Sequence, residues 1–160
     1  LWRLLYDQLV NKYGLDNLIW VWTVDVTKGA EDQFMDWYPG DEYVDILGVD
    51  IYEKNVDAKS RQYQALVDIG KGGKLVTISE CGNIPDPAKC MEAGNKWSWF
   101  MVWCTTDSNG NLALNNKDWS YNTLEHWKNV MCGPYVLNRE DMPSFVIPSE
   151  RSESRNLNNI

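Results

Sequence analysis

The sequence is short of positive charge and has no long apolar run. Its 160 residues include 15 Lys and Arg against 23 Asp and Glu, which gives a formal net charge of −8. An acidic surface repels phosphate backbones and anionic lipids, so the composition argues against nucleic acid and membrane partners. No stretch approaches the roughly 18 consecutive apolar residues that a membrane-spanning helix needs.

Cysteine and histidine are also scarce. The sequence holds four Cys and a single His, without a CxxC pair, so we expect no metal site. A chain of this length does not need a disulfide scaffold to fold. Cys81 and Cys90 lie nine residues apart around a proline-containing loop, and two interpretations stay open for them: a disulfide bridge or buried free thiols.

Phenylalanine is rare as well, with three residues, whereas the sequence holds nine Trp and eight Tyr. Trp and Tyr combine an apolar ring with a polar edge. Such side chains suit ligands that are apolar on one face and hydroxylated on the other, and sugars are ligands of this type. The aromatic composition therefore favours a carbohydrate ligand.

Apolar runs that end in turn signals alternate with stretches of helical periodicity. This alternation predicts an α/β fold made of βα units with a parallel sheet. A barrel of eight such units needs about 250 residues, so this chain, with four βα units, corresponds to about half of a (β/α)8 TIM-barrel type fold. The predicted strands cover residues 18–23, 44–52, 75–79 and 97–104, and the predicted helices cover residues 57–69, 86–93 and 121–131, with a less regular segment at 27–39.

The two ends of the chain differ from this pattern. Residues 1–14 carry apolar residues at helical spacing but no N-cap residue ahead of Leu1, so we expect that the chain was cut from a longer one. Residues 144–160 are rich in Ser, Glu, Arg and Asn without a period, which predicts a flexible tail. The expected domain therefore covers residues 1–143.

Three polar side chains stand where predicted strands end. Glu80 follows the apolar run LVTIS, and Asp50 and Tyr52 share one face at the end of VDILGVDIY. In parallel α/β proteins, chemistry collects at the carboxyl ends of the strands. A carboxylate there costs free energy to bury unless it is paired or used, so Glu80 is a candidate catalytic residue. The alternatives are a solvated Glu80 in a loop, an Asp50 that caps a turn and a Tyr52 that only packs.

Two strand tryptophans are candidate ligand-stacking residues. Trp103 ends the last predicted strand, and Trp22 lies on the first. Packing in the core is the more frequent role of a Trp on a strand, and it is the alternative for both. Trp103 is the better placed of the two for a sugar, because it stands at a strand end.

Four phrases, in this order, resemble the carboxyl-terminal half of glycoside hydrolase family 26: DNLIWVWTV, WYPGDEYVDILGVDIY, VTISECGNIPDP and WSWFMVWCTTD. The resemblance covers residues 1 to about 145. It implies a (β/α)8 barrel in which the four predicted strands are the fifth to the eighth. It also implies retaining endo-hydrolysis of β-1,4-mannosidic linkages in mannan, galactomannan or glucomannan.

The resemblance implies a role for individual residues. Glu80 falls on the nucleophile, Tyr52 on the Tyr that hydrogen-bonds and orients it, and Trp103 on the floor of the cleaved sugar's subsite. Asp50 and Trp22 are further candidate substrate-binding residues. No metal and no cofactor is implied.

The family's general acid/base, a Glu that follows a His at the end of strand four, is absent from the sequence. We therefore expect the chain to be inactive alone. Its expected partners are β-mannan or manno-oligosaccharides, and either the missing amino-terminal half of the barrel or a second copy. The family usually acts outside the cytoplasm, which implies an extracellular or periplasmic location.

Two alternatives stay open for the function. One is a β-glucanase or xylanase of the same fold, because subsite loops decide the substrate. Many relatives carry a Ser-Pro-Asn phrase where this chain has Thr23-Val24-Asp25, so subsite roles there are undecided. The other alternative is a truncated, non-catalytic remnant that binds glycan.

Overall fold

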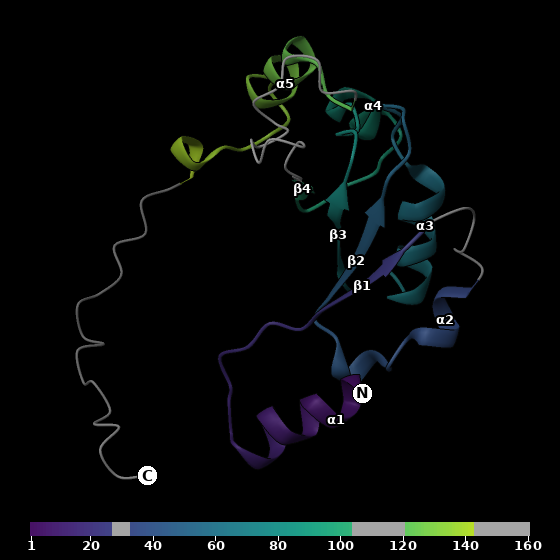
Figure 1. Ribbon diagram of the computed structural model, residues 1–160, viewed down its shortest axis with the longest axis vertical. Coiled ribbons are helices and arrows are strands. Elements are labelled where there is room, and N and C mark those ends of the chain that lie inside the picture. Colours follow the sequence, from purple (N-terminus) through teal and green to yellow (C-terminus); the bar gives the residue numbers. More distant parts are fainter. Residues whose placement is uncertain (27–32, 104–120, 143–160) are drawn as a thin grey trace, which may run out of the picture.

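The computed structural model describes residues 1–26, 33–103 and 121–142. These residues form a four-stranded parallel sheet in the order β1-β2-β3-β4, so each strand lies beside its neighbour in sequence (Figure 1). The connections contain helices, as expected for consecutive βα units. The strands are β1 (Val21–Asp25), β2 (Ile46–Ile51), β3 (Leu75–Cys81) and β4 (Phe100–Val102).

Short helices precede and follow these strands. Asp86 accepts a 2.9 Å hydrogen bond from the Ala88 N–H at the start of α4, where Pro87 occupies the first turn. Thr123 caps α5 in the same way through the His126 N–H. The helices are α1 (Trp2–Tyr6), which continues as a π-helix over Asp7–Lys12, α2 (Phe34–Trp37), α3 (Ser60–Ile69), α4 (Pro87–Glu92) and α5 (Leu124–Met131), with 3-10 turns at Asp41–Tyr43 and Arg139–Asp141.

One face of the sheet forms the hydrophobic core. Helix α3 packs against β2 and β3, and its Leu66 is fully buried. Alternate strand residues point to this face because the side-chain period of a strand is two. The fully buried strand residues on this face are Leu47, Val49, Ile51, Ile78 and Cys81.

An aromatic cluster fixes α1 beneath the amino ends of β1 and β2. The Trp2 ring meets the Trp20 ring at 5.5 Å, and the Tyr6 ring lies 5.1 Å from both Trp20 and Tyr43. The Trp2 Nε1 also donates a 2.9 Å hydrogen bond to the Tyr43 carbonyl. Part of the aromatic content noted in the sequence therefore serves packing, at the end of the sheet opposite the strand ends discussed below.

The structure adjusts some predictions. Strand β1 begins at Val21 and not at residue 18, because its pairing with β2 starts at Val21, opposite Ile46. Cys81 and Cys90 are free and buried, which decides between the two interpretations left open above, whereas Cys132 is exposed. Cys104 and the predicted tail lie outside the described residues. Within residues 1–26, 33–103 and 121–142, no helix is long and apolar enough to cross a membrane.

Candidate active site

The carboxyl ends of β2 and β3 bring together three of the residues singled out in the sequence. Asp50 and Glu80 are direct partners in the parallel register of these strands. Tyr52 follows the end of β2, and its hydroxyl donates a 2.6 Å hydrogen bond to Glu80 Oε2. Glu80 is half-buried, and the Tyr52 side chain is 42% exposed, so the pair borders solvent. A ligand can therefore reach the Glu80 carboxylate.

An irregularity in β3 places Glu80 opposite Asp50. Ile78 opposes Val49 and Cys81 opposes Ile51, and all four side chains face the core. β3 thus has two residues, Ser79 and Glu80, where β2 has only Asp50. Such a bulge lets a strand present a side chain that strict alternation would turn away, and bulges often stand next to active sites.

A glycine in the middle of β2 lets the neighbouring strands interact across it. The Thr23 Oγ1 of β1 and the Ser79 Oγ of β3 lie 2.8 Å apart in a hydrogen bond. A Cβ atom on Gly48 would overlap both oxygens, so only glycine leaves room for this contact. An isolated Gly inside a strand is the sequence signal that could have indicated this close approach.

Charge repulsion and burial give Asp50 unusual electrostatics. Burial, followed by the negative charges of Glu80 and Asp25, raises the pKa of Asp50 to about 7, although the Glu80 N–H donates a hydrogen bond to it. Its Oδ1 is buried and has no hydrogen-bond partner among the described residues. Asp50 therefore holds a proton far more readily than an ordinary carboxyl group.

The tyrosine is held in its protonated form. Partial burial, and then the hydrogen bond to Glu80, raise the pKa of Tyr52 above its usual range. Tyr52 thus remains a hydrogen-bond donor at neutral pH. Its hydroxyl holds one oxygen of Glu80 in a fixed direction, as an oriented nucleophile requires.

The two candidate tryptophans have different environments. Trp103 follows β4, its backbone N–H donates a 3.0 Å hydrogen bond to the Cys81 carbonyl, and its side chain is 46% exposed. Its backbone therefore lies beside the strand end that carries Glu80. Trp22 is only 5% exposed and packs edge-to-face against Tyr38 in the core. The structure thus corrects the expectation for Trp22, because strand alternation turns it to the helix-covered face.

The loop after Glu80 is held by a residue that the sequence analysis missed. Asn122 is buried, and its side chain accepts a 2.9 Å hydrogen bond from the Ile84 N–H and donates one of 2.6 Å to the Gly82 carbonyl. The ring of Tyr121 lies against Gly82, where a Cβ atom would overlap it. The segment before α5 thereby fixes the backbone just beyond the strand end. No sequence pattern marked this Asn, since its partners are backbone groups distant in sequence.

The site offers acid/base and nucleophilic groups rather than metal ligands. Across the described parts of the chain, no group of three or more His, Cys, Asp or Glu side chains is arranged to hold a metal ion. The arrangement instead combines an oriented carboxylate, a carboxyl group that retains a proton and an exposed aromatic ring nearby. Such a combination suits attack by a carboxylate on a sugar.

Comparison with known proteins gives consistent matches. The family model described as glycosyl hydrolase family 26 matches residues 1–141. The mannan endo-1,4-beta-mannosidase of Thermothelomyces thermophilus is 39% identical over 145 residues, which are 91% of this chain and 27% of that protein. Mannan endo-1,4-beta-mannosidase B of Piromyces sp is 35% identical over 156 residues, 98% of this chain and 24% of that protein. The chain thus spans about a quarter of the length of these relatives.

Solved structures agree with the sequence matches. The GH26-CBM35 β-(1,4)-mannanase of Podospora anserina superposes with a TM-score of 0.70 at 34% identity, covering 88% of this chain and 28% of that one. A β-mannanase from a symbiotic protist of the termite Reticulitermes speratus, complexed with gluco-manno-oligosaccharide, gives a TM-score of 0.69 at 33% identity, covering 90% and 41%. The predicted fold, part of a (β/α)8 barrel with four consecutive βα units, is confirmed.

Proposed function

Because this chain belongs to glycosyl hydrolase family 26, we propose that it forms the nucleophile-bearing half of a (β/α)8 enzyme that cleaves β-1,4-mannosidic linkages with retention. The observation that carries this proposal is the 2.6 Å hydrogen bond from Tyr52 to Glu80 at the carboxyl edge of the sheet. In this proposal, residues 1–143 are the carboxyl-terminal half of the catalytic domain, with residues 144–160 as a tail.

Glu80 is the nucleophile in this mechanism. Its carboxylate attacks the anomeric carbon of the bound mannose, and the glycosidic carbon–oxygen bond breaks. The resulting ester is then hydrolysed by water, which releases Glu80 and restores the original configuration. Tyr52 aims Oε2 of this nucleophile through its hydrogen bond.

The leaving oxygen needs a proton from a second carboxyl group. In retaining glycosidases the two carboxyl groups stand about 5–5.5 Å apart, and the second acts first as acid and then as base. By family resemblance, this group is a Glu at the end of barrel strand four, ahead of the segment matched here. The preceding half of the barrel would supply it.

The remaining residues bind the sugar in this proposal. Trp103 offers an exposed indole ring as a platform for the cleaved sugar. Asp50 lies beside Glu80 in register and can exchange hydrogen bonds with a sugar hydroxyl. A neutral polysaccharide needs no basic cleft, which agrees with the net charge of −8. Since a mannan polymer is not taken up intact, we place the activity outside the cytoplasm.

The proposal is tested in a complete barrel. The part of the Thermothelomyces thermophilus mannosidase that precedes its matched segment is fused to Leu1 of this chain, and hydrolysis of mannan, glucomannan and xylan is measured. We expect cleavage of mannan and glucomannan but not of xylan. Glu80→Ala should abolish it, and azide should restore turnover of an activated aryl β-mannoside with an α-mannosyl azide as product.

A matched control is Glu92→Ala, which removes an exposed carboxylate at the end of α4. It should leave hydrolysis unchanged. An inactive parent barrel, or Glu80→Ala activity within tenfold of the parent, would contradict the proposed function.

A further inference from the structure

The connection from β2 to α3 ends in a buried lysine with a strained backbone. Lys59 is 5% exposed and has a φ of 56°, in the left-handed region that glycine or asparagine normally occupies. Lys is almost never fully buried unless it is paired. If this connection served only to reverse the chain, a glycine at position 59 would adopt the same backbone conformation without strain. The side chain of Lys59 is therefore the part of this residue that requires an explanation.

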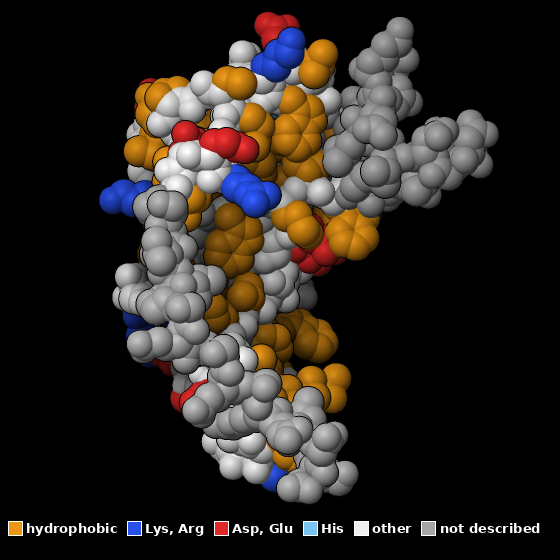
Figure 2. Space-filling model, turned by 90° about the vertical axis from the view of Figure 1, so that its left-hand side faces the viewer, with side chains coloured by type: hydrophobic (Ala, Val, Ile, Leu, Met, Phe, Trp, Pro, Cys, Tyr) orange, Lys and Arg blue, Asp and Glu red, His pale blue; other side chains and the backbone are white. Residues whose placement is uncertain are grey.

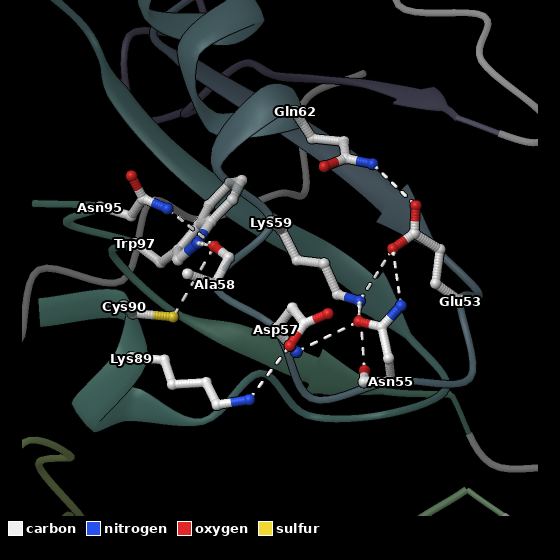
Figure 3. Close-up of polar contacts among 10 residues, drawn as sticks. All are labelled: Glu53, Asn55, Asp57, Ala58, Lys59, Gln62, Lys89, Cys90, Asn95 and Trp97. Atoms are coloured by element: carbon white, nitrogen blue, oxygen red, sulfur yellow. Dashed lines mark hydrogen bonds and ion pairs between the residues drawn. The ribbon is translucent and has the colours of Figure 1, made fainter. Parts of the chain in front are cut away.

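The Lys59 ammonium ties together the start and the end of this connection (Figure 3). Its Nζ donates to Glu53 Oε2 at 2.9 Å, to the Asn55 carbonyl at 3.1 Å, and to Asn55 Oδ1. All three ammonium protons thus have acceptors. The other oxygen of Glu53, Oε1, accepts a 3.0 Å hydrogen bond from Gln62 Nε2 on α3.

The ion pair keeps Glu53 charged. Partial burial alone would raise the pKa of Glu53, but the contacts with Lys59 and the hydrogen bonds from Asn55 and Gln62 lower it below its usual value. Glu53 therefore carries its negative charge beside the Lys59 ammonium near neutral pH. Partly buried pairs of this kind are costly to break, because the remaining charge loses its partner.

The same connection is held from its outer side. The Ala58 carbonyl accepts hydrogen bonds from Asn95 Nδ2 at 2.8 Å and Trp97 Nε1 at 3.3 Å, just before β4 (Figure 3). The Val56 carbonyl accepts a 2.9 Å hydrogen bond from the Asp86 N–H at the start of α4. The segment from residue 53 to residue 58 is thus fixed between a buried ammonium and the next βα unit.

We propose that Lys59 is a positioning residue for the Tyr52–Glu80 pair. Glu53 follows Tyr52 directly, so the Lys59–Glu53 contact fixes the chain at the point where Tyr52 reaches across to Glu80. Lys59 touches neither substrate nor Glu80 and acts only through Tyr52. This inference rests on the proposed function, because it assigns a consequence to the orientation of Glu80.

A double-mutant cycle in the complete barrel tests the inference. Lys59→Met keeps the length of the side chain and removes the ammonium. We expect kcat on mannan to fall at least tenfold, with KM within threefold of the parent, at a temperature well below the Tm of both proteins.

The cycle separates positioning from general stability. In a Tyr52→Phe background, Lys59→Met should lower kcat by less than threefold, because the interaction that it supports is already lost. A residue that only stabilises the fold would lower kcat by the same factor in both backgrounds. Equal factors, or a kcat within threefold of the parent in Lys59→Met alone, would overturn the inference.

Two further variants complete the design. Lys89→Met removes an exposed ion pair with Asp57 on the same segment and should leave kcat and KM unchanged. If Lys59→Met does not fold, Glu53→Gln replaces it, since it removes the ion pair while keeping the shape of the side chain. It must show the same selective loss of kcat and the same dependence on Tyr52, or the inference fails. Glu80→Ala activity tests the proposed function separately, because that variant leaves Lys59 in place.

Discussion

Asp50 and Glu80 are register partners at the ends of two neighbouring parallel strands, and the Glu80 N–H donates a hydrogen bond to the Asp50 carboxyl group. Two carboxyl groups so close cannot both ionise freely. Tyr52 donates to Glu80, whereas Asp50 Oδ1 has no hydrogen-bond partner among the described residues. The local contacts therefore separate the two: Glu80 accepts the Tyr52 hydrogen bond, and Asp50 is the group that keeps its proton.

This separation predicts a pH-dependent stability. The folded protein holds the Asp50 proton up to about pH 7, whereas an Asp in an unfolded chain loses it near pH 4. The folded state thus binds more protons between these values, and the free energy of unfolding falls as the pH rises from about 4 to 7. Asp50→Asn carries no charge, so it should raise the Tm at about pH 8 and change it little at about pH 4.

Calorimetry of the complete barrel at both pH values measures the effect. Asp16→Asn is the control, because Asp16 is exposed, and it should shift the Tm equally at both. An equal shift for Asp50→Asn at the two pH values would contradict this account.

The Tyr52 hydroxyl predicts a kinetic effect with little structural cost. Tyr52→Phe removes one hydrogen bond to a charged group, worth about 1.5–3 kcal/mol, so kcat should fall by roughly 10-fold to 150-fold. The ring stays in place, so the fold should be kept, with a Tm lowered by several degrees through loss of the hydrogen bond. Steady-state kinetics on mannan and a melting curve check both expectations. A kcat within threefold of the parent would show that the hydrogen bond does not serve catalysis.

Parts of this arrangement could be predicted from the sequence. The order of strands and helices follows from hydrophobic periodicity, and the Asp86-Pro87 start of α4 follows from helix-capping chemistry. That Asp50 and Glu80 lie at the same edge of the sheet follows from one rule, since parallel strands present their carboxyl ends at one edge. These features depend on local pattern, which the sequence displays directly.

Other parts depend on contacts between segments distant in sequence. The bulge at Ser79 and Glu80 has no local signature, so strict alternation would have turned Glu80 away from Asp50. Trp22 resembled a ligand-stacking residue because composition does not say which face of β1 is covered. The burial of Lys59 depends on Glu53 and on the chain approaching from α4, and charged residues are usually exposed.

The two tryptophans allow a matched comparison. Trp22→Ala empties a buried site and should cost about 3–5 kcal/mol in the free energy of unfolding. Trp103→Ala removes a ring that is 46% exposed, so the stability should change much less, whereas kcat/KM on mannan should fall at least tenfold if the ring supports a sugar. Denaturant melts and kinetics on both variants test this. A strongly destabilised Trp103→Ala protein with normal kcat/KM would place that ring in a packing role.

Gly48 predicts a sharp penalty for one added methyl group. Gly48→Ala would push its Cβ atom into Thr23 Oγ1 and Ser79 Oγ, break their hydrogen bond and cost about 1–3 kcal/mol. Gly73→Ala is the matched control, because its Cβ atom would meet only the Gly70 carbonyl oxygen, at 3.6 Å. It should change stability by less than about 0.5 kcal/mol. Denaturant unfolding of both variants measures these changes. If Gly48→Ala were as stable as Gly73→Ala, the close approach of Thr23 and Ser79 across β2 would be refuted.

The two outer strands predict the behaviour of the 160-residue chain on its own. Among the described residues, β1 and β4 each pair with a strand on one side only. Figure 2, seen from the side on which β4 lies in Figure 1, shows hydrophobic side chains over the middle and upper parts of that face. Exposed hydrophobic residues in and around β4 are Trp99, Met101, Trp103, Tyr135 and Leu137.

Unpaired strand edges with apolar side chains associate with other chains, whereas closure of a barrel removes such edges. We therefore expect the isolated chain to dimerise or aggregate, and to form a defined complex with a separately expressed amino-terminal half. Alone we expect it not to hydrolyse mannan, because in the proposed mechanism the group that protonates the leaving oxygen is a Glu of the preceding half of the barrel, whereas Asp50 binds the sugar.

Light scattering and a mannan assay, with and without the amino-terminal half, test this expectation. Met101→Lys places a charge on the β4 edge and should reduce self-association, whereas Met91→Lys, on exposed α4, should not. A monodisperse monomer would refute the argument from open edges. Hydrolysis of mannan by that monomer would also contradict the proposed mechanism, which needs a second carboxyl group from the preceding half of the barrel.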